Sequence, residues 1–152
     1  MKNIDDEFIP AIFKYMDLEK LTFDELITLM NATRTHYLFC NHMWVRLHDY
    51  ITRNKIKTKV KYRNYIFKGI HRNGVLFTDK MISDYNKSMV EIVDEKSGVI
   101  DYDDCHIVLR HKDSNRYMKI SGEYTSYNGN EYYSDWLEVK PVEIVTVEYP
   151  YV

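Results

Sequence analysis

The spacing of apolar residues changes near position 54 of the chain. Before it, apolar residues recur every three or four positions, as they do along one face of a helix. From about Lys57 onward, apolar and polar residues alternate, which is typical of strands with one buried face. The pattern therefore predicts helices in roughly the first third of the chain and a β-sheet in the rest.

Local signals mark the helices of the first part. The apolar spacing from Ile9 to Met16 predicts one helix. A second helix is capped by Thr22, because Glu25 stands three residues later and completes a capping box. The apolar spacing then continues through THYLFCNHMWVRLHDYI and predicts a third helix. We therefore expect two or three packed helices over residues 4–52.

The remainder of the chain is predicted to form consecutive hairpins. Asn128-Gly129 is the strongest short-range hairpin signal, because both residues accept positive φ in a type I′ turn. The segment from Met89 to Tyr102 predicts another hairpin, with its turn at 96–98. The other expected elements are a helix at about 77–88, a turn at 113–115, and a β-branched strand in VEIVTVEYPYV that Pro150 ends.

Hairpins without long helices between them imply an antiparallel sheet. The predicted fold class is α+β: an N-terminal bundle of two or three helices, followed by an antiparallel β-sheet or small barrel. We divide the chain into a helical part, 1–54, and an antiparallel β domain, 55–152, that together form one compact unit. The length of 152 residues is enough for an ordinary core.

Composition places the chain among globular proteins. Hydrophobic residues make up 45% and charged residues 29%, and the formal net charge of −2 argues against a generally basic nucleic-acid-binding protein. Two cysteines, Cys40 and Cys105, do not make a disulfide framework. We see neither a signal peptide nor an apolar run of the roughly 20 residues that a membrane span needs. We therefore expect a soluble, cytoplasmic protein with no membrane partner.

Charge is segregated along the chain. Nine basic residues and one acidic residue lie between Arg46 and Arg72, whereas six acidic residues and one basic residue lie between Glu123 and Glu148. In a strand, alternate basic residues would form a row on one face that could follow a phosphate backbone. Alternatives are an edge strand protected from aggregation by lysine, pairing with the acidic segment, or a basic protein-binding surface. The basic row is Lys55, Lys57, Lys59, Lys61 and Arg63.

The segment GEYTSYNGNEYYSDWLEV, residues 122–139, is a candidate binding surface. Tyrosine and tryptophan supply large contact areas at interfaces, and the nearby carboxylates suit a basic protein patch. About half of the aromatic side chains should enter the core, and the alternative is cross-strand aromatic pairs that only stabilise the sheet. The predicted surface comprises Tyr124, Tyr127, Tyr132, Trp136, Glu131 and Asp135.

Two patterns suggest a metal. His36 and Cys40 share a helix face and could hold zinc together with Cys105 and His106. The favoured alternative is that Cys40 is a small core residue and His36 lies at the edge of the helix face. Glu138-x-Lys140 with upstream aspartates follows the logic of a metal-dependent nuclease, although solvated strand charges give the same pattern. Those aspartates are Asp101, Asp103 and Asp104. No nucleophile elbow or phosphate-binding glycine loop is present, so we predict no enzyme and no cofactor.

The C-terminal third resembles a segment of small, uncharacterised tailed-phage proteins, with a GxYxSYxG turn followed by EVxPxExTVxxY. The matching residues are Gly122, Tyr124, Ser126, Tyr127, Gly129, Glu138, Val139, Pro141, Glu143, Thr146, Val147 and Tyr149. The resemblance implies a phage or large-virus origin and no particular activity.

The N-terminal part resembles an F-box more weakly. Pro10, the YMDL step, Arg34 and Trp44-x-x-Leu47 carry this likeness, whereas the spacing from Pro10 to Tyr15 is short for the pattern. An F-box would imply binding to a Skp-type adaptor in a eukaryotic host.

These observations favour a binding protein over an enzyme. The first hypothesis is a phage or viral accessory protein that binds a host or phage protein, for host takeover or against a host defence. The alternatives are a nucleic-acid-binding protein that uses the basic row, an F-box-like adaptor-binding protein and a metal-dependent nuclease. The oligomeric state is not predicted.

Overall fold

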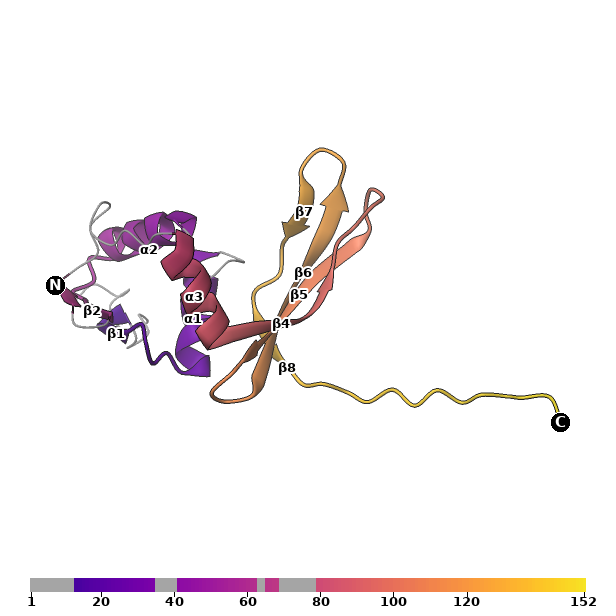
Figure 1. Cartoon of the computed structure of the whole chain (residues 1–152). Coiled ribbons are helices and arrows are strands. Elements are labelled where there is room, and N and C mark those ends of the chain that lie inside the picture. Colours follow the sequence, from indigo (N-terminus) through magenta and orange to yellow (C-terminus); the bar gives the residue numbers. More distant parts are fainter. Residues whose placement is uncertain (1–12, 35–40, 63–64, 69–78) are drawn as a thin grey trace.

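The computed structural model of the chain describes residues 13–34, 41–62, 65–68 and 79–152. Its three helices lie together at one end of a five-stranded sheet (Figure 1). This arrangement confirms the predicted α+β class. The helices are α1 (Phe23–Thr33), α2 (Asn41–Arg53) and α3 (Asp79–Met89).

Helix α1 begins where the capping box predicts. The Thr22 hydroxyl accepts a hydrogen bond from the Glu25 backbone N–H, and the Glu25 carboxylate accepts one from the Thr22 N–H, both at 3.2 Å. This exchange satisfies two N–H groups that the first turn would leave without partners. The helix ends at Arg34, which adopts a left-handed φ of 49°. Leu26 and Met30 point from the helix into the core.

A small sheet stands where the first helix was predicted. Strand β1 (Tyr15–Asp17) pairs in parallel with β2 (Lys59–Tyr62), which pairs antiparallel with β3 (Tyr65–Lys68). Met16 and Leu18 are buried while Tyr15 is exposed, so burial has the period of a strand at this point. The prediction of a helix reaching Met16 was therefore wrong, because pairing with a distant strand determines the conformation here. Residues 1–12, which carry the rest of that prediction, lie outside the described residues.

The larger sheet contains the predicted hairpins. Its strand order is β4-β5-β6-β7, and β8 pairs with β6 beyond the end of β7, so the sheet is open. The pairs β4–β5, β5–β6, β6–β7 and β6–β8 are antiparallel. The strands are β4 (Val90–Lys96), β5 (Asp104–His111), β6 (Arg116–Thr125), β7 (Gly129–Tyr132) and β8 (Leu137–Val139).

Two hairpin connections differ from their predictions. Thr125 pairs with Gly129, so the β6–β7 connection is a three-residue loop. Gly129, and not Asn128, adopts positive φ (70°), as in a loop closed by a left-handed residue rather than a type I′ turn. The predicted return strand after Lys96 is instead a loop over residues 97–103, which reaches β5 at Asp104.

Helices and sheet share one hydrophobic core. Trp136, only 1% exposed, leaves the sheet between β7 and β8 and packs into that core. Its backbone N–H donates to Asn31 Oδ1 at 2.7 Å, and Asn31 Nδ2 donates to its carbonyl at 3.0 Å. On β5, the buried His111 ring contacts the Leu21 carbonyl through Nε2 at 3.0 Å. These contacts attach one end of the sheet to α1 and to the segment just before it.

The predicted last strand does not form. Residues 140–152 have no regular structure, all are exposed, and the segment projects away from the body (Figure 1). The last registered pair of β8 is Val139 with Tyr117, one residue from the start of β6. Beyond that pair the turn before β6 begins and Pro141 lacks an N–H, so the ladder cannot continue. A β-branched sequence alone therefore did not suffice for a strand.

The described helices were also considered as possible membrane-spanning segments, which are long and apolar. None of them combines the length and the apolar character that a membrane crossing would require.

Candidate functional site

The end of the larger sheet that is farthest from the helices exposes a group of large apolar side chains. Two connections form this end: the β4–β5 loop, 97–103, and the β6–β7 loop, 126–128 (Figure 1). We call four of their side chains the tip surface. These are Val99, Ile100, Tyr102 and Tyr127, which are 81%, 70%, 77% and 96% exposed.

A strained residue lies within the β4–β5 loop. The Asp103 N–H donates to the Ile100 carbonyl at 3.0 Å and closes a four-residue turn. Tyr102, the third residue of this turn, has a φ of 73°. Glycine or asparagine normally occupies such a position, because a side chain in the left-handed region costs about 1–2 kcal/mol. The chain thus places a bulky aromatic residue where local geometry disfavours one.

Hydrogen bonds join the two loops of the tip. Asp101 Oδ1 accepts from the Ser126 N–H at 2.5 Å, next to Tyr127. The Tyr102 N–H donates to the Tyr124 carbonyl at 2.8 Å, and the Tyr124 N–H donates to the Asp103 carbonyl at 2.9 Å. The loops therefore hold each other's backbone in place while the side chains of the tip surface point away from the core.

A close contact also requires glycine at position 98. A Cβ atom on Gly98 would stand 2.1 Å from the Cβ of Tyr124, which is far inside contact distance. The Gly98 N–H donates to Asn130 Oδ1 at 3.0 Å, a bond from the loop to β7. The absence of a side chain thus lets the loop lie directly on the β6–β7 hairpin.

Carboxylates surround the tip surface. Asp103 Oδ2 accepts hydrogen bonds from the Val99 and Ile100 N–H groups at 3.1 and 3.0 Å. These bonds lower the pKa of Asp103 because they favour the ionised form. Asp101, Asp104 and Glu123 add negative charge to the same end of the sheet.

The structure separates the aromatic residues that the sequence grouped. Tyr127 is fully exposed at the tip, whereas Tyr124 and Tyr132 are half-buried. Trp136 lies in the core, so its assignment to a binding surface was wrong: the segment after β7 turns inward to meet Asn31. Trp136 is thus the only aromatic residue of 122–139 that is buried, and Tyr132 packs against the core without being buried.

The acidic members of the predicted surface lie beside the aromatic hairpin. The exposed Tyr133 hydroxyl donates to Glu131 Oε2 at 2.5 Å, and this bond to the carboxylate raises the pKa of Tyr133. Asp135 is exposed in the segment that leads to Trp136. Sequence reasoning missed Val99, Ile100 and Tyr102, because it assigned them to a strand; the neighbouring Ser97-Gly98 and Asp103-Asp104 were the available loop signals.

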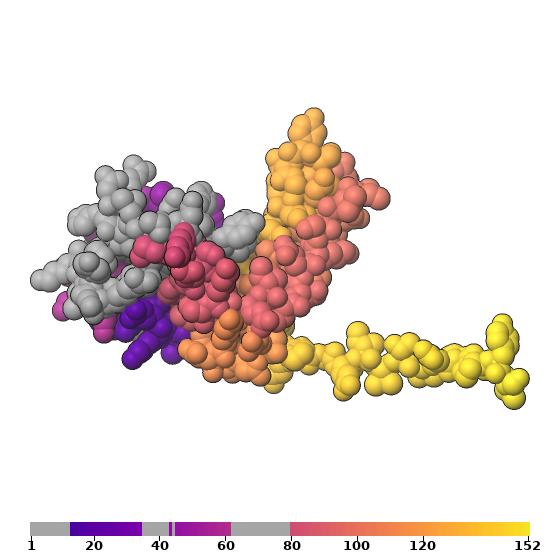
Figure 2. All heavy atoms as spheres, in the orientation of Figure 1, coloured from indigo at the N-terminus to yellow at the C-terminus, as the bar shows by residue number. Residues whose placement is uncertain are grey.

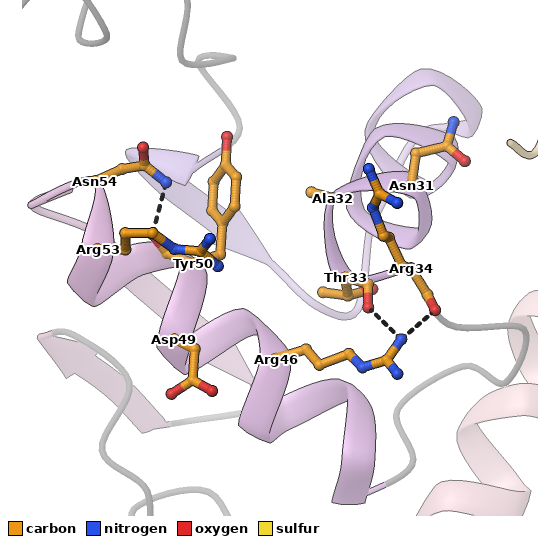
Figure 3. A pocket seen from close by; sticks show the side chains of 9 residues that line it. All are labelled: Asn31, Ala32, Thr33, Arg34, Arg46, Asp49, Tyr50, Arg53 and Asn54. Atoms are coloured by element: carbon orange, nitrogen blue, oxygen red, sulfur yellow. Dashed lines mark hydrogen bonds between the residues drawn. The ribbon is translucent and has the colours of Figure 1, made fainter.

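A second candidate site lies between the C-terminal end of α1 and α2. It is a pocket of about 630 Å³ whose lining includes Arg34, Arg46, Arg53 and Asp49 (Figure 3). Arg46 reaches across to α1 and donates to the carbonyls of Thr33, at 3.3 Å, and Arg34. Within the described residues, none of the three guanidinium groups is ion-paired with a carboxylate. The described lining, with three arginines and one aspartate, therefore carries a net positive charge.

The predicted basic row is not one strand. Lys55 lies just after α2 with a left-handed φ of 51°, and only Lys59 and Lys61 of the described members belong to β2. Lys61 lies 4.0 Å from the Asp17 carboxylate on β1. Lys57 is exposed in the connection before β2, and Arg63 lies outside the described residues. The row was therefore wrong as a single strand face, because α2 and its turn extend to position 55.

The structure gives other partners to the residues of the nuclease pattern. The Arg116 guanidinium binds both oxygens of Glu138, at 2.7 and 2.9 Å, and this bidentate contact lowers the pKa of Glu138. Asp101 and Asp103 accept backbone hydrogen bonds within the tip, as described above. These carboxylates therefore stabilise turns and strand contacts and do not converge on Lys140.

The residues of the zinc pattern are only partly described. His36 and Cys40 lie outside the described residues. Cys105 is fully buried, its Sγ lies 3.9 Å from the Glu131 carbonyl, and burial raises the pKa of the thiol. His106 Nε2 lies 2.7 Å from Asp94 Oδ2 on β4. Across the described ranges, no group of three or more His, Cys, Asp or Glu residues is arranged to hold a metal ion.

Known proteins add no further assignment. Comparison of the chain with protein-family models, with curated proteins and with solved structures finds no match.

Proposed function

We propose that the chain is a non-enzymatic protein-binding module that recognises a basic partner through the tip surface. The observation that carries the proposal is Tyr102, an exposed aromatic side chain held at a φ of 73°. Its ring is mostly exposed, so packing within the chain does not offset the conformational cost. A role in contact with another molecule accounts for tyrosine at this position.

The construction of the tip supports this proposal. Exposed apolar groups that gather at one place, as Ile100, Tyr102 and Tyr127 do, are typical of interaction surfaces. The bonds from Asp101 to Ser126 and from Asp103 to the loop backbone hold the surface in one conformation. A partner then loses less conformational entropy on binding than it would with a mobile loop.

Electrostatics supports a basic partner. Four carboxylates lie near the tip surface: Asp101, Asp103, Asp104 and Glu123. The basic residue nearest to them in the sequence is Lys96. Complementary charge around an apolar centre increases the association rate and discourages acidic partners. The partner surface that fits the tip surface is therefore an apolar depression flanked by lysine or arginine.

The resemblances supply two biological settings for a binding function. The tailed-phage resemblance favours an accessory protein that binds a host or phage protein, and the F-box resemblance favours a Skp-type adaptor. Both settings stay predictions, because no comparison tests them.

Affinity purification with quantitative mass spectrometry tests the tip surface. The tagged full chain is compared with Tyr102→Asn and Tyr127→Ala, and with Tyr149→Ala as a matched control, since Tyr149 is an equally exposed tyrosine in the C-terminal tail. We expect both tip variants to lose one co-purifying protein at least tenfold while the control retains it. Retention by the tip variants, or loss by the control alone, would contradict the proposal.

Nucleic-acid binding through the arginine pocket is the second candidate. The guanidinium groups of Arg34, Arg46 and Arg53, which have no carboxylate partner among the described residues, favour it. Lys55 and Lys57 lie close by in the sequence. Phosphate oxygens are suitable partners for such groups, because they can accept two hydrogen bonds from one guanidinium.

Fluorescence anisotropy with labelled single-stranded DNA and double-stranded RNA tests this candidate. We expect affinity that falls steeply between 50 and 200 mM salt, by about tenfold or more, because counterions are released on binding. Arg53→Gln should weaken binding, whereas Lys87→Gln on α3 should not. Absence of measurable binding at 50 mM salt excludes this candidate.

A further inference from the structure

The C-terminal tail, residues 140–152, has the sequence of a strand, and no strand of the described residues pairs with it. Between Pro141 and Pro150, five of eight residues are β-branched: Val142, Ile144, Val145, Thr146 and Val147. In an extended chain, Val145, Val147 and Tyr149 share one face. Both faces of the tail are exposed, and Figure 2 shows it standing clear of the body.

The position of β8 explains why the tail is unpaired. The tail follows β8, which lies beside β6 and ends almost level with the start of β6. The tail therefore projects past the end of its own sheet. The opposite edge of that sheet is β4, separated from β8 by β5 and β6. The tail, which has a strand-forming sequence, follows β8 on one side of the sheet. The edge strand β4, which could accept a further strand, lies on the other side.

The β4 edge has the properties of an acceptor. Within the described residues, β4 pairs only with β5, and its side chains from Glu91 to Lys96 are exposed. Ile92 is 58% exposed and Val93 is 43% exposed, at the register shift between Ile92 and Asp94, so two apolar side chains lie on this edge beside charged ones. An edge strand of this kind offers a row of N–H and C=O groups to another extended segment.

We infer that the tail of one copy adds as a further strand to β4 of a second copy of this chain. The lengths agree, because β4 has seven residues and eight residues lie between Pro141 and Pro150. Every copy carries both donor and acceptor, so the two are present in equal amounts at any concentration. Backbone hydrogen bonds and the burial of Val145 and Val147 beside Ile92 supply the attraction.

Charge permits this pairing. The tail carries Glu143 and Glu148, and β4 carries Glu91, Asp94 and Glu95. Arg110 binds the Glu91 carboxylate at 2.6 Å, and His106 lies 2.7 Å from that of Asp94. The Arg110 guanidinium also lowers the pKa of Glu91, and its positive charge offsets that of the Glu91 carboxylate, which leaves less negative charge facing an added strand.

Mass measurement in solution tests the inference first. Light scattering after size-exclusion chromatography should give the full chain a mass of two or more copies, against 18.4 kDa for one. A chain that ends at Lys140 should give the mass of one copy and should still unfold cooperatively, because the core of the described residues contains no residue of the tail. Its unfolding temperature should not depend on protein concentration, whereas that of the full chain should rise with concentration. A full chain of single-copy mass at 100 μM, or a truncated chain that still associates, would overturn the inference.

A pair of substitutions distinguishes strand addition from non-specific hydrophobic association. Thr146→Pro removes an N–H and should reduce the mass to one copy, whereas Thr146→Val keeps a strand-forming residue and should preserve association. Equal masses for the two variants would overturn strand addition.

Cross-linking locates the acceptor. A photoreactive benzoylphenylalanine in place of Tyr149 should form cross-links to residues 90–96 of another copy. Cross-links confined to the tail of another copy, or to the tip surface, would overturn the assignment to β4. The tip-surface proposal stands or fails separately, because none of these variants changes the tip.

Discussion

The two ends of the larger sheet show how one set of strands can serve two purposes. At the end near the helices, Met118 and Trp136 are buried, and side chains such as Asn31 and His111 bridge to α1. At the far end, backbone hydrogen bonds join the β4–β5 loop to β6, but Tyr102 and Tyr127 face solvent. Burial stabilises the near end, and hydrogen bonds between loops order the far end.

This difference predicts which property a substitution at each end of the sheet should change. Apolar burial contributes most to the free energy of unfolding, whereas exposed hydrogen bonds contribute less and determine local conformation. Changes near the helices should therefore affect global stability, and changes at the tip should affect local order and binding. Each of the following predictions tests one part of this contrast.

Replacement of Trp136 by alanine should have the largest effect. Removing a fully buried indole leaves a cavity, and we expect the free energy of unfolding to fall by about 3–5 kcal/mol. Tyr127→Ala at the exposed end should change it by less than about 0.5 kcal/mol. Urea denaturation of both variants makes the measurement, and similar losses would refute the contrast between the two ends.

Asn31→Ala should come second. It removes the side chain that binds both the N–H and the carbonyl of Trp136. Leaving partly buried backbone groups without partners costs about 1–3 kcal/mol. Asn128→Ala in the exposed β6–β7 loop is the matched control, for which we expect almost no change. If the two asparagine variants unfold at the same urea concentration, Asn31 does not join helix and sheet as described.

Gly98→Ala should disturb the tip and leave the near end intact. The added methyl group would collide with Tyr124, and such overpacking costs about 1–3 kcal/mol. We expect faster amide hydrogen exchange over residues 98–103, with unchanged protection of β8. Ser97→Ala, at the adjacent exposed position, provides the control. Uniformly faster exchange along the whole sheet would show that the two ends are not independent.

The smallest expected effect is a dependence on pH. The pKa of Asp103 is lowered in the folded chain by its bonds to two N–H groups, so its ionised form stabilises the fold. This stabilisation is complete well above the ordinary value of 3.8 and is lost as the pH falls through the lower folded value. Asp103→Asn should therefore lose less stability than the unchanged chain between about pH 5 and pH 2.

Urea denaturation across that pH range provides the measurement for Asp103. Asp113→Asn, at the opposite end of the sheet, serves as the control and should follow the unchanged chain. Identical pH dependence for the unchanged chain and Asp103→Asn would show that this carboxylate does not order the loop.

Local chemistry alone determined several features of this protein. The capping box of Thr22 and Glu25 started α1 where predicted, and the turn residues between β5 and β6 closed their hairpin where predicted. The helix expected at about 77–88 corresponds to α3. These features depend on residues within a few positions of one another, so sequence spacing contains the information.

Only the tertiary structure decided the remaining features, because they depend on partners far along the chain. Pairing of β1 with β2 turned a helical pattern into a strand, and the β6–β8 ladder ended at Val139, so the C-terminal tail pairs with no described strand. Contact with Asn31 drew Trp136 into the core. The bond between the Tyr102 N–H and the Tyr124 carbonyl, beside that between Ser126 and Asp101, holds Tyr102 on the surface. The exposure of an aromatic side chain is a property of such distant contacts and cannot be obtained from its neighbours in sequence.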